Sequence, residues 1–315
     1  MISKLKSFFH FQKGIVESTK VIVESSSNDV VNRLYYKCKV DELNQCVINS
    51  TKNGITTSNI ADTEVIVSLT THSFRINDVY LAIESIMQGT MLPNRIILWL
   101  SQEYENTPLP ITLQNQMKRG LDVRFCKDIR SYTKLIPALR EFPNSAIVTI
   151  DDDIIYPIDT LEHLVNAYNN SHNCICAYWV HAIPTDLKEK YTSFLKWPDV
   201  TGQVEKSHLY FYEGFGGVLY PPKSLDDDVL NEDVFLDICK SADDVWFNAM
   251  SLKRGTPVQY VNPRPGLFKC IGNPNVQSIA LRNVNSNGEI LNDVCIKNVF
   301  QKYGIFEKLS ECCSN

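Results

Sequence analysis

Between residues 64 and 170 the sequence alternates two kinds of apolar pattern. Short runs rich in apolar residues, which predict strands, occupy residues 64–71, 94–101, 121–126 and 146–150. Segments with apolar residues at helical spacing follow them, at residues 76–87, 111–120, 132–142 and 157–170. This alternation predicts an α/β fold, with a mostly parallel central sheet, right-handed crossovers and helices on both faces.

Three consecutive aspartates, Asp151, Asp152 and Asp153, come directly after the last of these runs; we call them the aspartate triplet. Ligands of parallel sheets bind outside the carboxyl ends of the strands, so the triplet should line a cleft. Carboxylates that converge there suit a hard divalent cation. Alternate side chains of an extended chain point to the same face. The side chains of Asp151 and Asp153 would therefore share a face, and that of Asp152 would point to the other. A solvated turn that caps the next helix is the alternative.

A second acidic group, the acidic pair Asp243 and Asp244, stands where a helix is predicted to begin. The helix dipole favours negative charge there, so capping is one explanation of the pair. The apolar residues Trp246, Phe247 and Met250 would bury this helix and hold its first turn rigidly. A carboxylate fixed in that way could serve as a general base.

Between the two acidic groups lies the glycine segment, residues 214–217, in which only position 215 is not glycine. Gly214, Gly216 and Gly217 would let the backbone approach a ligand closely, ahead of a predicted strand that ends at Pro221. A glycine-rich bend beside the strand is the alternative, because the segment lacks the dinucleotide-binding fingerprint.

Residues 1–62 lack the alternating pattern. We expect an N-terminal appendage there, followed by one domain at residues 63–315. Residues 1–14 mix lysines with phenylalanines. They fit either a basic amphipathic helix on an anionic membrane or a helix packed on the body of the protein. No stretch approaches the roughly 20 apolar residues of a transmembrane helix.

Composition narrows the partners and the cellular context. The net charge of −5 argues against broad electrostatic capture of nucleic acid. The ten cysteines show no CxxC pair and no zinc-ligand spacing, and the sequence opens with no secretory signal. We therefore expect reduced thiols in a cytoplasmic protein, with peripheral contact at the inner face of the plasma membrane if residues 1–14 form the amphipathic helix.

From about residue 64 to residue 305 the sequence resembles bacterial glycosyltransferases of the A-type (GT-A) fold, family-2-like, which build surface polysaccharides such as lipopolysaccharide, O-antigen and capsule. The resemblance rests on motifs in the same order, at residues 67–86, 95–101, 130–139, 149–157, 214–222, 242–250 and 290–305. It implies metal-dependent, inverting transfer of a sugar from a nucleotide diphosphate sugar, with UDP expected, to a hydroxyl of a saccharide or lipid-linked saccharide acceptor.

By this resemblance the triplet corresponds to the Asp-x-Asp motif of donor binding. Asp153, together with Asp151, is implied as a ligand of Mn²⁺ or Mg²⁺ on the diphosphate. Asp151 is implied to contact ribose or sugar hydroxyls, and Asp152 is implied to belong to the nucleotide-sugar site. No histidine follows His208, where many A-type enzymes have a further metal ligand. Either water and phosphate complete the metal shell, or the metal binds weakly.

Further roles follow from the same motifs. The remaining residues implied to bind the nucleotide sugar are Thr70, Thr71 and Arg75 around the base, Lys134 facing the donor, and Gly216 and Gly217 under the sugar. Asp244 is implied as the catalytic base, with Asp243 orienting it or touching the acceptor. His181 would either contact the acceptor or serve as a structural hydrogen-bond partner.

Two rival functions stay open. A phosphatase of the aspartyl-phosphate type would use Asp151 as nucleophile and Asp153 as acid, although that type usually has threonine or valine where this chain has Ile154 and Ile155. A nucleotide-sugar-binding protein without catalysis would tolerate the change Asp244→Asn, whereas a transferase would not.

Overall fold

The structure is a computed structural model that describes residues 30, 33–171, 173–184, 193–202, 206–261, 271–273 and 291–312. The chain divides into two compact units, residues 1–45 and residues 46–315. In the first unit, residues 33–45 are helical. The amphipathic segment considered at residues 1–14 lies outside the described residues. None of the described helices is both long enough and apolar enough to cross a membrane.

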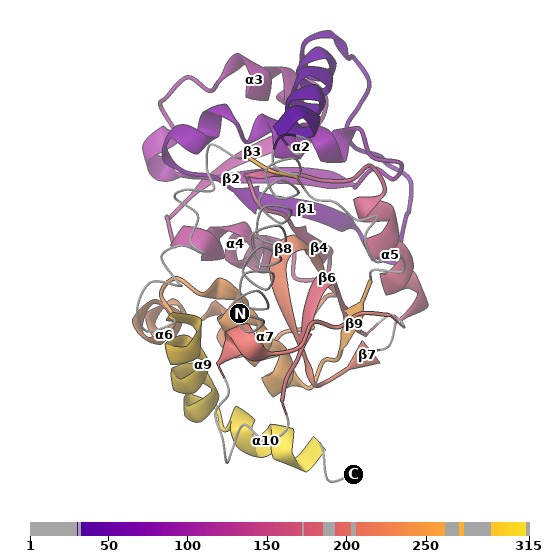
Figure 1. The fold of residues 1–315 in the computed structure, drawn as a ribbon. Helices are drawn as coiled ribbons and strands as arrows, with labels where there is room; N and C mark the ends of the chain where they lie inside the picture. The colour runs from indigo at the N-terminus through magenta and orange to yellow at the C-terminus, as the bar shows by residue number, and fades with distance from the viewer. Residues whose placement is uncertain are drawn as a thin grey trace, which may run out of the picture. The chain divides into compact units, whose positions relative to one another are not determined.

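The second unit is built on an eight-stranded sheet with the order β3-β2-β1-β4-β8-β6-β9-β7 (Figure 1). Its strands are β1 (Val65–Thr70), β2 (Arg95–Ser101), β3 (Leu121–Cys126), β4 (Ala146–Thr149), β6 (Ile175–Ala182), β7 (Lys206–Ser207), β8 (Tyr210–Tyr220) and β9 (Val258–Tyr260). A separate pair joins β5 (Ile154–Ile155) to β10 (Ile271–Gly272). Strands β1 to β4 pair in parallel, as predicted, whereas β8 runs antiparallel to both β4 and β6.

Helices cover both faces of this sheet (Figure 1). One face, toward which Val67 of β1 points, carries α2 (Tyr80–Met87), α3 (Ile111–Met117) and α5 (Thr160–Asn170). The other face, toward which Ile66 points, carries α4 (Ile136–Glu141), α6 (Glu232–Ile238), α7 (Asp243–Arg254), α9 (Leu291–Lys302) and α10 (Ile305–Cys312). Each fully buried aliphatic side chain stabilises the fold by about 1.5–3 kcal/mol. The predicted α/β class is confirmed.

The helix predicted at residues 132–142 divides in two. A 3-10 turn, η3 (Arg130–Lys134), is followed by α4. The carbonyl of Lys134 accepts a hydrogen bond from Ser68 Oγ at 2.6 Å, so a neighbouring strand takes an acceptor that a continuous helix would use. Pro137 lies in the first turn of α4, where its missing N–H is tolerated. The break places Lys134 beside β1.

The glycine segment lies inside a strand, which corrects the expectation that the strand follows it. Strand β8 contains the whole segment and ends directly before Pro221. The register between β8 and β6 shifts between Ala177 and Trp179, so residues 214–217 form a bulge. Gly217 in this bulge has a φ of 92°, a conformation that glycine adopts without strain.

Residues 46–62, which the sequence analysis assigned to the appendage, belong to the second unit. The Gly54 amide donates to the Arg119 carbonyl at 2.8 Å, and the Thr56 amide donates to the Pro93 carbonyl at 2.9 Å. Pairing of backbone groups in this way fixes the segment against loops of the α/β unit.

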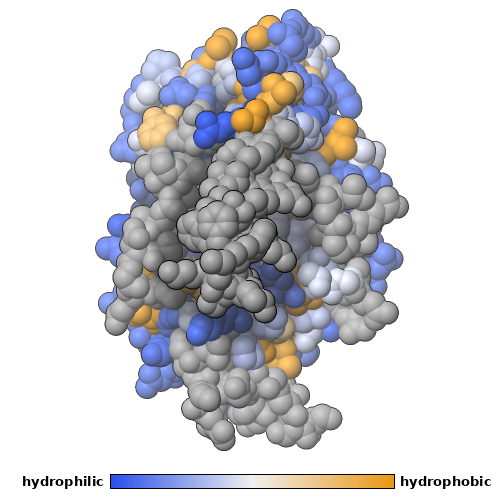
Figure 2. All heavy atoms as spheres, viewed as in Figure 1, coloured by the Kyte–Doolittle hydropathy of each residue, from blue (hydrophilic) through white to orange (hydrophobic). Residues whose placement is uncertain are grey.

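The described surface carries few large apolar side chains. In the view of Figure 2 it is mostly hydrophilic, with apolar residues in small separate groups. Among the described residues of the second unit, the exposed large apolar ones are Ile48, Phe74, Ile111, Met117, Ile158, Trp179, Leu195 and Phe215. Apolar residues scattered singly are normal on a protein surface.

Candidate active site

The aspartate triplet lies at the carboxyl end of β4, as predicted. Asp152 is buried and accepts hydrogen bonds from Thr71 Oγ1 and Arg75 Nη1, each at 2.6 Å. Arg75 Nη2 also donates to Asp153 Oδ2 at 3.0 Å. The alternation expected of an extended chain does not apply here, because residues 152 and 153 form a turn. Arg75 therefore holds Asp152 and Asp153 together, and Asp151 has a different partner.

Lys134 connects the triplet to the acidic pair. Its buried ammonium lies 3.0 Å from Asp151 Oδ1 and 3.1 Å from Asp243 Oδ2. Burial alone would lower the pKa of Lys134, but the charges of Asp151, Asp243 and Asp244 raise that pKa well above its ordinary value. The side chain therefore stays protonated and neutralises carboxylates from distant parts of the sequence.

The acidic pair begins α7, whose apolar face is buried as predicted. Asp244 Oδ2 accepts a hydrogen bond from the Gly214 amide of β8 at 3.1 Å. Its other oxygen, Oδ1, is buried and has no hydrogen-bond partner within the described part of the chain. The Asp244 carboxylate is thus held by the bulge of β8 and keeps one oxygen for another partner.

Burial raises the pKa of three of these acids, Asp152, Asp153 and Asp244. It raises the pKa of the Asp244 carboxyl to about 8, an effect that the charge of Asp243 strengthens and that Lys134 and the Gly214 amide oppose. Burial, together with the charge of Asp151, raises the pKa of Asp153 to about 6 although Arg75 opposes the shift. Asp244 therefore exchanges its proton in the pH range in which a general base works.

Replacing Asp244 by asparagine should make the protein relatively more stable at high pH. The folded state of the wild type keeps the Asp244 proton up to about pH 8, while the unfolded state loses it near 3.8. Stability of the wild type therefore falls as the pH rises through this range, and asparagine has no such dependence. Calorimetry at pH 5 and pH 9 should show that the difference in melting temperature, variant minus wild type, increases with pH. An equal difference at both values would contradict the raised pKa.

The glycines of the bulge let the backbone approach these groups closely. A Cβ at position 214 would lie 2.9 Å from Lys134 Nζ and 3.0 Å from Asp244 Oδ1. A Cβ at position 216 would lie 2.6 Å from Trp179 Cδ1. Gly214 was predicted to allow close approach of the backbone, but the resemblance gave a role only to Gly216 and Gly217; in the structure the Gly214 amide is the group that holds Asp244.

Two predicted residues use their polar atoms elsewhere. Thr70 Oγ1 donates to the Trp99 carbonyl of the neighbouring strand at 2.9 Å. His181 lies between two carboxylates, with Nδ1 3.0 Å from Asp199 Oδ1 and Nε2 2.9 Å from Glu213 Oε1. Burial lowers the pKa of His181, but the hydrogen bond and charge of Glu213 and the charge of Asp199 raise it more. The pKa of His181 therefore lies above its ordinary value. This arrangement fits the structural role considered for His181, and an acceptor contact stays a prediction.

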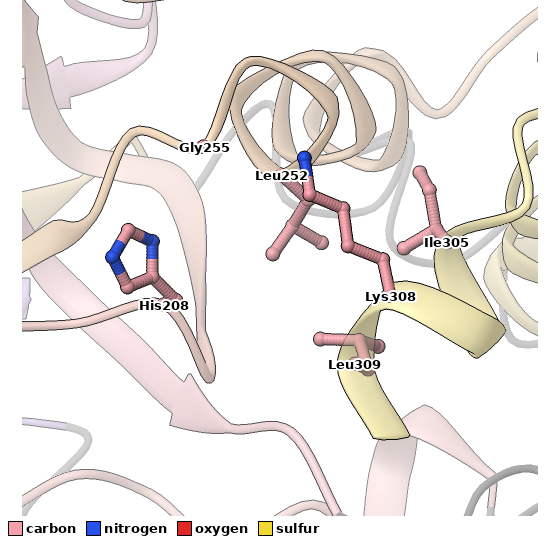
Figure 3. Close-up of a pocket in the computed structure, with 6 residues that line it drawn as sticks. All are labelled: His208, Leu252, Gly255, Ile305, Lys308 and Leu309. Atoms are coloured by element: carbon pink, nitrogen blue, oxygen red, sulfur yellow. The ribbon is translucent and has the colours of Figure 1, made fainter. Parts of the chain in front are cut away.

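A small cavity lies at the far end of α7 from the acidic pair (Figure 3). It is lined by His208, Leu252, Gly255, Ile305, Lys308 and Leu309. The 12 residues of α7 separate its two ends by roughly 17 Å. None of the predicted site residues lines this cavity, so it is separate from the candidate site.

No protein-family model matches the chain, and no curated protein matches it. Solved structures that are similar include UTP-bound UGPase from Acinetobacter baumannii, with a TM-score of 0.42 and 10% identity, over 73% of this chain and 96% of that chain. A UDP-glucose pyrophosphorylase complexed with UDP-glucose has a TM-score of 0.39 and 9% identity, over 77% and 99%. Glucosyl-3-phosphoglycerate synthase from Mycobacterium tuberculosis, in complex with Mn²⁺, UDP and phosphoglyceric acid, has a TM-score of 0.29 and 16% identity, over 37% and 43%. At these identities and TM-scores, the function rests on the residues of this chain alone.

Proposed function

We propose that the protein is an inverting glycosyltransferase, which moves a sugar from a UDP-sugar to a hydroxyl of a saccharide or lipid-linked saccharide acceptor in cell-surface polysaccharide synthesis. One observation carries the proposal. The buried ammonium of Lys134 lies within 3.1 Å of carboxylates from both the triplet and the acidic pair, at the carboxyl edge of the sheet. The triplet, proposed to bind the donor, and the acidic pair, proposed to supply the base, therefore both lie next to Lys134. Sugar transfer requires the donor and the base to be this close.

Asp244 is proposed as the base that takes the proton of the acceptor hydroxyl as it attacks the anomeric carbon. Its Oδ1 lacks a hydrogen-bond partner within the described ranges, and the Gly214 amide fixes the other oxygen. Asp243 is held by Lys134 and is proposed to orient Asp244 or to touch the acceptor. Attack by a hydroxyl with the help of one base inverts the anomeric configuration, so no carboxylate nucleophile is needed.

The triplet is proposed to bind the diphosphate through Mn²⁺ or Mg²⁺. Carboxylate oxygens are the donors that these cations prefer, and the repulsion between Asp151 and Asp153, which raises the pKa of Asp153, is what a cation would relieve. In the part of the chain that is described, no three His, Cys, Asp or Glu side chains are placed to hold a metal together. Phosphate and water oxygens would therefore complete the shell, as is common for Mg²⁺. The cation would neutralise charge on the leaving diphosphate.

Two further donor contacts are proposed from the neighbours of the triplet. Thr71 and Arg75 adjoin the triplet through Asp152, which fits a nucleotide bound across the ends of β1 and β4.

We also propose that the protein acts in the cytoplasm, where a UDP-sugar is available. If the acceptor is lipid-linked, the protein would contact the inner face of the plasma membrane.

Chelation of metal should abolish release of UDP. A screen of UDP-sugars with Mn²⁺ should identify at least one donor that wild-type protein converts, and EDTA or the change Asp153→Ala should remove this activity. Asp237→Ala is the matched control, because Asp237 is an exposed aspartate of α6. Activity that survives both EDTA and Asp153→Ala would refute the metal assignment. Release of inorganic phosphate from phosphate esters, without release of UDP from UDP-sugars, would favour the phosphatase.

A further inference from the structure

Two large aromatic side chains are exposed beside the candidate site. Trp179 of β6 is 40% exposed and Phe215 of β8 is 36% exposed. Their rings form a T-shaped contact, with centroids 5.7 Å apart and planes at 69°. The other tryptophans, Trp99, Trp197 and Trp246, are all at most 4% exposed. Trp179 is therefore exposed whereas the other three tryptophans are buried. We call Trp179 and Phe215 the aromatic pair.

The aromatic pair lies at the same edge of the sheet as the aspartate triplet. Strand β8 runs antiparallel to both β4 and β6, so the carboxyl ends of β4 and β6 point the same way. The triplet follows β4 directly, and Trp179 lies in the second half of β6. Phe215 lies in the bulge of β8 between them.

The aromatic pair is also close to the proposed base. Within the bulge, the Cβ position of Gly214 adjoins Asp244 Oδ1, and that of Gly216 adjoins Trp179 Cδ1. Residues 214 and 216 are two apart in the chain, and two residues span at most about 7 Å. A short saccharide could therefore contact the indole of Trp179 and present a hydroxyl to Asp244.

We infer that the aromatic pair is a platform that binds a pyranose ring of the saccharide acceptor. This inference rests on the proposed function. A pyranose ring offers a face of C–H groups, which packs well on an apolar aromatic surface with an electron-rich face. Glu213, opposite Trp179 in the strand register, adds a partly exposed carboxylate that can accept hydrogen bonds from sugar hydroxyls.

The position of the aromatic pair favours the acceptor over the donor nucleotide. Thr71 and Arg75, the contacts proposed for the nucleotide, follow β1. Strands β4 and β8 separate β1 from β6, and three strand spacings amount to about 14 Å. The platform thus lies at the bulge of β8, which holds Asp244, and on β6 beyond it, away from the nucleotide contacts. An acceptor bound there would bring its hydroxyl to Asp244 from the side opposite the nucleotide.

The exposure of Trp179 provides a direct test. Acrylamide quenches exposed tryptophans, so quenching of intrinsic fluorescence reports on Trp179. The probes are methyl glycosides of glucose, galactose, mannose and N-acetylglucosamine, each titrated with and without UDP. We expect at least one glycoside to protect wild-type protein from quenching. The variant Phe215→Ala keeps Trp179 as the fluorescent reporter. Its half-saturating concentration of glycoside should be roughly 2- to 12-fold higher than that of the wild type. Tyr35→Ala, which removes another exposed aromatic ring, should match the wild type.

The result that would overturn the platform is protection by none of the glycosides, or equal half-saturation in wild type and Phe215→Ala. A response of Trp179 to vesicles of phosphatidylglycerol and phosphatidylcholine, without a response to any glycoside, would also overturn it in favour of a membrane surface. Calorimetric titration of wild type with UDP separates the two proposals. If the wild type binds UDP but none of the glycosides, only the platform is wrong. If the wild type does not bind UDP, the proposed function is wrong.

Discussion

The variant Asp244→Asn is expected to transfer sugar roughly 10²- to 10⁴-fold more slowly than the wild type, because a positioned general base contributes about that factor. Asparagine has nearly the same shape as aspartate, and it can keep the hydrogen bond from the Gly214 amide. It cannot accept the proton of an attacking hydroxyl. The measurement is kcat/KM with a converted UDP-sugar, and the matched control is Asp237→Asn on the exposed face of α6.

The pH profile makes the same test sharper. If Asp244 is the base, kcat/KM of the wild type should rise with an apparent pKa near 8, because the carboxyl must lose its proton to act. The residual activity of Asp244→Asn should lack this rise. A variant with activity within a few-fold of wild type, or one that keeps the rise, would assign the base to another residue.

The second large effect is expected on stability. The change Lys134→Met keeps a long side chain but removes the buried cation between Asp151 and Asp243. Breaking a buried ion pair on one side leaves an uncompensated charge, so the free energy of unfolding should fall by about 3–5 kcal/mol. Urea denaturation followed by circular dichroism at pH 7.5 measures this difference.

Lys127→Met is the matched control for that experiment. Lys127 pairs with Glu232 at 2.8 Å, but its side chain is 70% exposed. Exposed ion pairs contribute about 0–1 kcal/mol, so this variant should lose little stability. Equal losses in the two variants would mean that Lys134 does not neutralise the two acidic groups, and the single observation behind the proposed function would then fail.

Much of the α/β unit follows from sequence pattern. Strands β1, β2 and β4 are short apolar runs that are buried on both faces, and such runs are read from the sequence with little ambiguity. The place of the triplet follows from the same pattern, because the carboxyl end of a parallel strand is known once the strand is known. The predicted burial of α7 is confirmed for a similar reason, since its apolar residues recur at helical spacing.

The partners of the charged groups could not be read from the sequence. Lys134 meets Asp243 only because η3 and α7 lie against the same end of the sheet, and no local spacing encodes that contact. The turn at residues 152 and 153 brings two aspartates to Arg75, which the alternation of an extended chain cannot predict. Trp179 stands in an apolar strand, so its sequence context suggests a core residue, and its exposure depends on the shifted register with β8.

The triplet and the acidic pair are proposed to form one nucleotide-sugar site around Lys134. The most direct measurement is a crystal structure of the protein with UDP and Mn²⁺, with the metal located by anomalous scattering. We expect Mn²⁺ on the carboxylates of Asp151 or Asp153, with the UDP diphosphate beside the metal and the uracil toward Thr71 and Arg75. UDP bound away from the carboxyl end of β4, or Mn²⁺ on neither aspartate, would contradict this proposal.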